Sequence, residues 1–142
     1  MSADDDNGLR FEVVEHTADW ALRVYGRNLA QLLENAALGM AYLMVGDLET
    51  VALEERRTLI LDAFDAETLL VDWLTELAYW AEDEQLVFRV FELSEVTEHH
   101  LSAVMRGGKA AELQKHIKAV TYHDLEIVET DGGVVTTIVF DV

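Results

Sequence analysis

Acidic groups near both ends of the sequence could together hold a divalent cation. Near the start, the sequence EHTAD at positions 15–19 interrupts a strand-like run with two carboxylates, an imidazole and a hydroxyl. At the other end, the sequence stops within an apolar, strand-like run, so that the side chain of Asp141 stands beside the α-carboxylate of Val142. Two adjacent carboxylates repel each other unless a cation or a hydrogen-bond donor neutralises them. Hard oxygen ligands of this kind suit calcium or magnesium.

Each of these stretches also has a simpler explanation. The residues at 15–19 are typical of an Asx or ST turn, in which side-chain oxygens bond to the local backbone. The terminal pair of carboxylates is also compatible with a solvated chain end. Residue spacing alone favours these simpler explanations over a metal site.

Several other kinds of chemistry are excluded or unsupported. The chain has no cysteine, which rules out disulfides, thiol nucleophiles and cysteine-based zinc or iron–sulfur sites. It lacks the glycine-rich phosphate-binding motifs, the serine nucleophile elbow and the HExxH zinc motif. Of the five histidines, His99 and His100 are adjacent in a polar connection, where neighbouring side chains usually diverge. We therefore do not expect a histidine zinc site.

The charge balance restricts the partners. With 10 Lys and Arg against 28 Asp and Glu, the 142-residue chain has a formal charge of −18. Tight direct binding to nucleic acid or to an anionic membrane is not expected, because phosphate groups repel such a protein. Basic protein surfaces and divalent cations are favoured instead. Abundant acidic residues with few lysines would also suit a high-salt cytoplasm.

No apolar run approaches the ~20 residues that a membrane span requires. The acidic start lacks the basic-then-apolar order of a signal peptide. We expect a cytoplasmic protein with a flexible acidic leader at residues 1–10 and a single domain at residues 11–142.

Two segments that would support these sites have the apolar spacing of amphipathic helices. The first begins after Asn28, whose side chain can cap the free amides, and ends at Gly46. The second begins after Asp65 and carries Trp73 and Trp80 on its apolar face. Aromatic residues at this spacing more often belong to a core than to a cofactor site.

Strand-like segments fill most of the remaining chain. Residues 86–91 and 101–106 are expected to pair, with Gly107 and Gly108 ending the second strand, and the sequence DGG at 131–133 is a hairpin turn signal. The other strand-like segments are 11–15, 21–25, 57–64, 117–122, 125–128 and 134–142.

These elements predict an α+β fold, because many strands follow one another without a helix between them. We expect a two-layer domain, with a mixed, largely antiparallel sheet of five to seven strands. The two main helices are expected to pack on one face of that sheet.

The pattern as a whole resembles the archease family. Five motifs in order carry the resemblance, which covers roughly residues 11–142. Each motif is weak alone, but the ordered set is highly specific. The motifs are EHTAD at 15–19, NAALGM at 35–40, LVDWL at 70–74, IKAVTYH at 117–123 and FDV at 140–142.

The resemblance implies a protein cofactor rather than an enzyme. Archeases assist the RtcB-type RNA ligase, which joins tRNA halves with GTP and divalent metal after guanylylating its own active-site histidine. An archease speeds that guanylylation and supports multiple turnover in tRNA splicing or RNA repair.

The resemblance also assigns roles to individual residues. The metal site of the family falls on Asp19, Asp141 and Val142, with calcium expected first and magnesium or manganese as alternatives. Lys118 matches the lysine of the IKAVTYH motif and is expected to contact the ligase, with an ordinary strand-edge lysine as the alternative. Glu15 and His16, which flank the metal site, are also expected to bind the partner.

Two other function classes are open at this point. One is a general chaperone or specificity modulator of a tRNA methyltransferase or another nucleic-acid enzyme, a role also linked to archease-like proteins. The other is a small metal-dependent hydrolase built on Asp19 and Asp141. The sequence argues against the hydrolase, because no further base, nucleophile or phosphate-binding loop accompanies the acids.

Overall fold

The computed structural model describes residues 10–15 and 20–142 of the chain. From the amino end to the carboxyl end, the elements of this part are β2 (Phe11–Glu15), β3 (Trp20–Gly26), α1 (Leu29–Val45), the short 3-10 helix η1 (Leu48–Thr50), β4 (Glu55–Asp62), α2 (Ala66–Glu84), β5 (Leu86–Ser94), β6 (His100–Lys109), β7 (Ala119–Val120), β8 (Val128–Thr130) and β9 (Gly133–Asp141).

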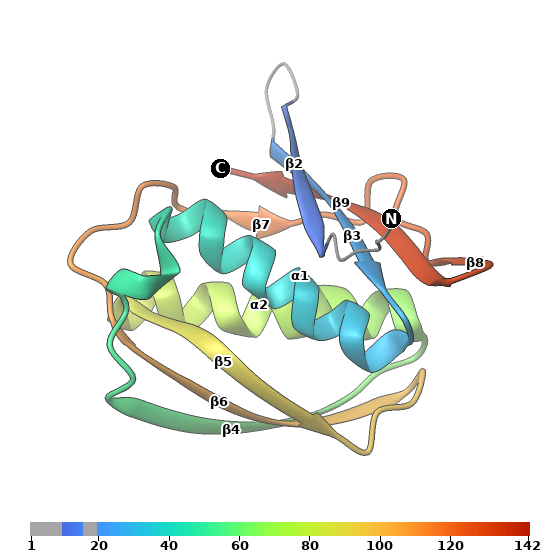
Figure 1. The fold of residues 1–142 in the computed structure, drawn as a ribbon, viewed down its shortest axis with the longest axis horizontal. Coiled ribbons are helices and arrows are strands. Elements are labelled where there is room, and N and C mark those ends of the chain that lie inside the picture. Colours follow the sequence, from blue (N-terminus) through green and yellow to red (C-terminus); the bar gives the residue numbers. More distant parts are fainter. Residues whose placement is uncertain (1–9, 16–19) are drawn as a thin grey trace.

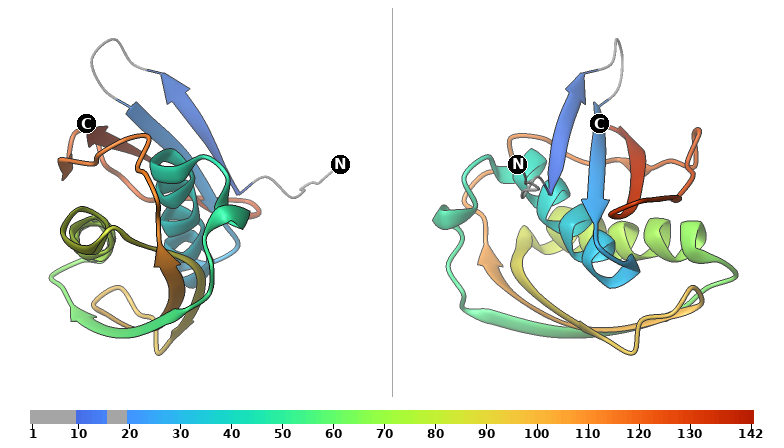
Figure 2. Two further views of the ribbon diagram at one scale, coloured as in Figure 1. Left: turned by 90° about the vertical axis from the view of Figure 1, so that its left-hand side faces the viewer. Right: turned by 45° about the vertical axis from the view of Figure 1, so that its right-hand side comes forward.

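The described strands form two antiparallel sheets. One, the upper sheet in Figure 1, has the order β2-β3-β9-β7, with β8 also pairing with β9. The other has the order β4-β6-β5. Both helices lie between the two sheets (Figure 1), and two further views show the same layers (Figure 2). The predicted α+β class with two main helices and antiparallel pairing is confirmed.

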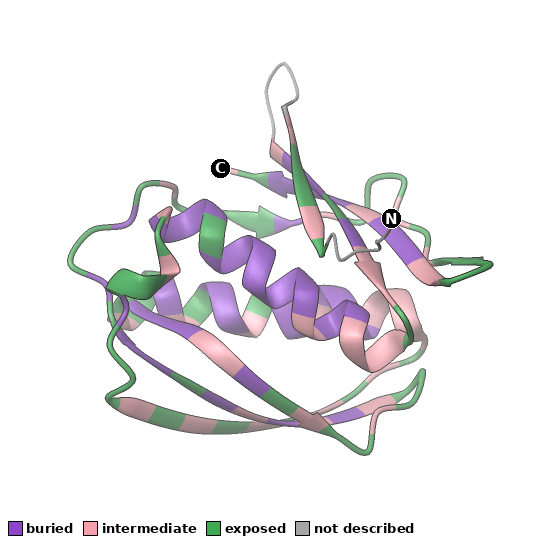
Figure 3. Ribbon diagram, viewed as in Figure 1, coloured by how far each residue is buried: buried purple, intermediate pink, exposed green. Residues whose placement is uncertain are grey.

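The strands divide between two sheets, whereas the sequence suggested one sheet with the helices on one face. The physical reason lies in α1, which buries twelve of its seventeen residues. A helix that is apolar over most of its circumference must be covered on more than one side. In Figure 3 the middle of α1 is buried almost throughout, because the upper sheet covers one side and β5 covers another.

Polar caps fix both ends of α1. The side chain of Asn28 accepts a hydrogen bond from the Gln31 amide at 2.9 Å, as the sequence predicts. The Gln31 side chain reaches back and accepts from the Arg27 amide at 2.7 Å. At the other end, Gly46 has φ of 81° and donates its amide to Tyr42 O at 2.8 Å. This positive φ favours glycine at that position.

The second helix begins at the predicted cap and binds α1 through a buried tryptophan. Asp65 accepts from the Thr68 amide at 2.8 Å. Trp73 is fully buried, and its indole N–H donates to Leu33 O of α1 at 2.9 Å. Trp73 therefore belongs to the core, and Trp80 packs against it partly buried, as predicted.

Several predicted strands have other bounds than the observed ones, and three of them show the reasons. The strand predicted at 57–64 runs from Glu55 to Asp62, because the chain turns there toward the cap of α2. Of the predicted strand at 117–122, only Ala119 and Val120 pair, since they meet just the last two residues of β9. The segment predicted at 125–128 is displaced to Val128–Thr130, because the hairpin turn sets Thr130 opposite Gly133.

The prediction that Gly107 and Gly108 end a strand is also wrong. Strand β6 continues through both glycines to Lys109. A side chain at Gly107 would run into the Val87 carbonyl oxygen, and one at Gly108 would run into the Ala52 carbonyl oxygen. These glycines therefore permit a close approach of neighbouring backbone, from β5 at Gly107 and from the connection before β4 at Gly108.

None of the helices in the described part of the chain has both the length and the apolar character needed to cross a membrane.

Candidate functional site

The upper sheet brings the two halves of the predicted site toward each other. Glu15, the last residue of β2, pairs with Trp20, the first residue of β3. Trp20 in turn pairs with Phe140 of β9, which directly precedes Asp141. The residues that flank positions 16–19 therefore lie in one row with the end of β9.

Part of the predicted site lies outside the described residues. Asp19 and His16 belong to positions 16–19, and the side chain of Glu15 is likewise not described. Their predicted roles stay predictions. In the sequence, Asp19 is followed by Trp20, which is described and pairs with Phe140.

Backbone hydrogen bonds fix the chain end against Lys118. The Lys118 amide donates to Asp141 O at 2.7 Å, and Ala119 pairs with Asp141 in the β7–β9 ladder. Thr121 adds two bonds to Val139 O, from its amide at 3.0 Å and its hydroxyl at 3.1 Å. The structure thus brings together Lys118, Asp141 and Val142, three of the predicted site residues.

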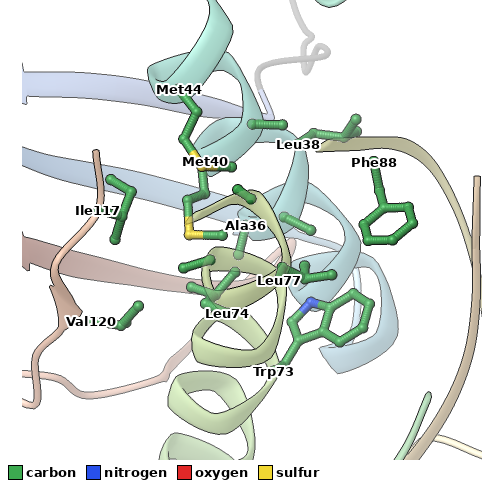
Figure 4. Packing of buried hydrophobic residues seen from close by; sticks show 14 of the residues in the cluster. Ala36, Leu38, Met40, Met44, Trp73, Leu74, Leu77, Phe88, Ile117 and Val120 are labelled. Atoms are coloured by element: carbon green, nitrogen blue, oxygen red, sulfur yellow. The ribbon is translucent and has the colours of Figure 1, made fainter. Parts of the chain in front are cut away.

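Buried apolar residues support this part of the sheet from below. Phe140 is fully buried, and Ile117 and Val120 are nearly so. Figure 4 shows Ile117 and Val120 beside Met40 of α1 and Leu74 of α2. The two helices therefore hold both segments that carry the site residues.

Sequence reasoning missed Lys115. Its ammonium group lies 4.0 Å from the centroid of the Trp20 ring, an arrangement typical of a cation–π contact. The two residues lie far apart in the sequence and share no motif, so nothing in the spacing signals the contact. Lys115 and Lys118 place two of the three lysines of this acidic chain close to the end of β9.

The donor atoms at the chain end suit a hard divalent cation. The side chain of Asp141 is exposed and Val142 is half-buried. Within residues 10–15 and 20–142, no ion pair joins either carboxylate to a basic side chain. Carboxylate oxygens are hard ligands of the kind that calcium, magnesium or manganese prefer, so the metal site remains a prediction that this geometry permits.

The described residues offer no metal site built from three side chains. Among them, no three His, Cys, Asp or Glu side chains are grouped so that they could hold a metal ion. The histidines form pairs instead: His100 Nδ1 lies 2.8 Å from Asp62 Oδ1, and His116 Nδ1 lies 3.0 Å from Glu82 Oε2.

Comparison with known proteins gives a consistent result. The archease protein family matches residues 11–142. "Protein archease" of Methanosarcina mazei is 38% identical over 143 residues, covering 95% of this chain and 97% of that protein. The corresponding protein of Sulfurisphaera tokodaii is 33% identical over 139 residues, covering 94% and 99%.

Two solved structures have similar folds. The solution structure of Methanobacterium thermoautotrophicum protein 1598 has a TM-score of 0.76 and 32% identity, covering 93% of this chain and 98% of that one. The crystal structure of an archease from Thermotoga maritima, described as a possible chaperone, has a TM-score of 0.62 and covers 96% and 99%. At 22% identity, this second likeness concerns the fold alone.

Proposed function

The chain belongs to the archease family, and from this premise we propose that it is a protein cofactor of an RtcB-type RNA ligase. It promotes the GTP-dependent guanylylation of the ligase and its multiple turnover in tRNA splicing or RNA repair. One structural observation supports this proposal more than any other. The pairing of β3 with β9 holds the neighbours of Asp19 and Asp141 in one row at one end of a sheet.

The proposed site consists of Asp19, Asp141 and Val142, with Lys118 on the adjoining segment. A bound divalent cation, calcium in the first instance, would supply positive charge that can hold phosphate oxygens of GTP or ligand groups of the ligase. The carboxylates of this chain would orient the cation, and none of them needs to transfer a proton.

Lys118 is proposed to contact the ligase directly. Its side chain is exposed, while its backbone amide is held by Asp141 O at 2.7 Å. The ammonium group therefore projects from a segment that is fixed beside the proposed site. Glu15 and His16 are proposed to contact the ligase from the neighbouring strand end.

The overall charge supports docking onto such an enzyme. A ligase that binds polyanionic RNA and GTP needs a basic surface around its pocket. A domain with a charge of −18 is attracted to that surface, which raises the rate of association and makes it dependent on salt.

The test follows the covalent guanylate adduct on the RtcB-type ligase of the same host, with labelled GTP and divalent metal. Wild-type protein should accelerate formation of the adduct, and Asp141→Ala should remove most of the acceleration. Asp131→Ala is the matched control, because Asp131 is an exposed carboxylate in the β8–β9 turn of the same sheet. Full stimulation by both Asp19→Ala and Asp141→Ala would remove the proposed site from the mechanism.

Calcium binding can be measured without the ligase. Titration calorimetry on the full chain should show binding that Asp141→Ala abolishes and Asp131→Ala leaves intact. Unchanged binding by Asp141→Ala would contradict the proposed ligands while leaving the partner open.

A second function is the chaperone role that the archease resemblance also implies, and the name 'possible chaperone' of the Thermotoga maritima structure is compatible with it. In that case the chain would modulate a tRNA methyltransferase or another nucleic-acid enzyme. Affinity purification from the host distinguishes the two functions, because the ligase should be recovered under the first and the methyltransferase under the second.

A further inference from the structure

Among the strands that the structure describes, β4 has an open edge. It forms one margin of the three-stranded sheet and pairs with β6 on its other side. Figures 1 and 2 show β4 at the bottom of the molecule, with both helices above the three-stranded sheet. An edge strand presents unpaired N–H and C=O groups that can pair with another strand.

The ladder identifies which groups are open. Ala63 donates its amide to His99 O at 2.9 Å and continues the register in which Leu61 faces Leu101. In an antiparallel pair, hydrogen-bonded residues alternate with residues whose amides point away. The odd-numbered residues of β4 therefore bond to β6, and the even-numbered residues turn their amides to the open edge. These are Arg56, Thr58, Ile60 and Asp62.

The same four residues are exposed on the outer face of the sheet. Ile60 is 66% exposed, so its side chain is free to contact a partner strand. Arg56 stands directly opposite Arg106 of β6. Like charges directly opposite each other destabilise a sheet, and Arg56 has no ion-pair partner among the described residues.

We propose that β4 pairs with β4 of a second copy of this chain, forming a dimer with two-fold symmetry. The axis passes Leu59, and Thr58 faces Ile60 of the second copy. Arg56 then faces Asp62 of the second copy, whose Oδ1 lies 2.8 Å from His100 Nδ1 and whose other carboxylate oxygen is left for the guanidinium. The same ion pair is repeated by symmetry. Opposite charges across an antiparallel pair stabilise it. The dimer joins the three strands of each copy into one continuous sheet.

Other registers lack this complementarity. A shift by one residue sets even-numbered residues opposite odd-numbered ones, so that side chains change faces and the amides no longer align. A shift by two residues sets Glu54 opposite Asp62 in one direction and Arg56 opposite Phe64 in the other. The charge pattern of β4 therefore selects one register.

The dimer forms against the repulsion between two chains that each have a charge of −18. Screening by salt weakens this long-range repulsion more than it weakens the close Arg56–Asp62 pairs. Association should therefore strengthen as salt rises. In addition, the Arg57 guanidinium donates to Arg56 O at 3.2 Å and must release that carbonyl.

The experiment is sedimentation equilibrium of the full chain in molar potassium chloride, up to millimolar concentration. Wild type should form dimers. Arg56→Asp and Asp62→Arg each place like charges opposite each other at both symmetric positions. Each should raise the dissociation constant of the dimer by about tenfold or more. The double variant R56D/D62R restores opposite charges and should recover the dimer.

Two further variants separate the interface from charge and folding effects. Glu129→Arg changes the net charge as much as Asp62→Arg but lies in β8 of the other sheet, so it should leave the dimer unchanged. Thr58→Pro removes an amide that faces the open edge, which a proline tolerates, and should give a folded monomer by circular dichroism. If the wild type is a monomer at all concentrations, the proposal is wrong. The charges of β4 would then serve to prevent its edge from pairing with other chains. Failure of the double variant to recover the dimer also overturns the proposal.

Discussion

Replacement of Trp73 by phenylalanine tests how the two helices are joined. Trp73 of α2 is fully buried, donates to Leu33 O of α1 at 2.9 Å and packs edge-on against Phe91 with ring centroids 5.9 Å apart. Phenylalanine keeps an aromatic ring but loses the indole N–H. The loss of one hydrogen bond to a buried carbonyl costs about 1 kcal/mol.

The smaller ring adds a packing cost. Phenylalanine has roughly 40 Å³ less volume than tryptophan, and at about 24 cal/mol per Å³ of residual cavity this costs about 1 kcal/mol. We therefore expect Trp73→Phe to lower the free energy of unfolding by about 2 kcal/mol. Urea denaturation monitored by circular dichroism measures this difference. An unchanged dependence of the unfolding free energy on urea concentration (the m value) would show that only stability has altered.

Trp80→Phe on the same helix provides the control. Trp80 is half-buried and packs edge-on against Phe88 at 5.5 Å, and its indole N–H has no hydrogen-bond partner among the described residues. The same substitution should cost about 1 kcal/mol or less there. Equal costs at the two positions would refute the assignment of a stabilising hydrogen bond between the helices.

Three further predictions concern the helix caps and the charge. Asn28→Ala removes the side chain that accepts a hydrogen bond from the Gln31 amide at 2.9 Å. It should lower the free energy of unfolding, measured by urea denaturation, by about 1 kcal/mol. An unchanged free energy of unfolding would contradict the role of Asn28 as a cap. Hydrogen bonds from the hydroxyl and the amide of Thr68 lower the pKa of Asp65 in the folded protein below its usual 3.8. The ionised Asp65 therefore stabilises the folded protein above pH 3.8, and this contribution is lost as the pH falls through the lower, folded-state pKa. The stability difference between wild type and Asp65→Ala, measured in urea at several pH values, should therefore be constant near neutrality and shrink only in acid. Finally, the free energy of unfolding should be larger in molar salt than in dilute buffer, because salt screens the repulsion between the acidic side chains. The Debye length falls from about 30 Å at 0.01 M to about 3 Å at 1 M. Equal stability in the two buffers would show that this repulsion is negligible.

The helices and their caps could be predicted because the signals are local. Asn28, Gly46 and Asp65 act within one turn of the chain, and each occupies its predicted position. The division of the strands into two sheets depends instead on which faces of α1 need covering. That requirement appears only when the burial of the whole helix is considered together with the strands around it.

The same distinction applies to the candidate site. Asp141 and Lys118 were found through motifs, and the ladder between β7 and β9 brings their backbones together. Lys115 was missed because its contact with Trp20 joins distant parts of the chain with no shared pattern. The glycines of β6 were misread because a close approach of two backbones leaves no signature in a single sequence.

The position of β9 has a consequence for biosynthesis. This strand, the last element of the chain, lies between β3 and β7 in the upper sheet. During translation, α1, α2 and the β4–β6–β5 sheet emerge from the ribosome before β9, while the hairpin of β2 and β3 must wait for its central neighbour. Completion of the upper sheet therefore waits for β9, whereas the helices and the β4–β6–β5 sheet can pack before this strand is available.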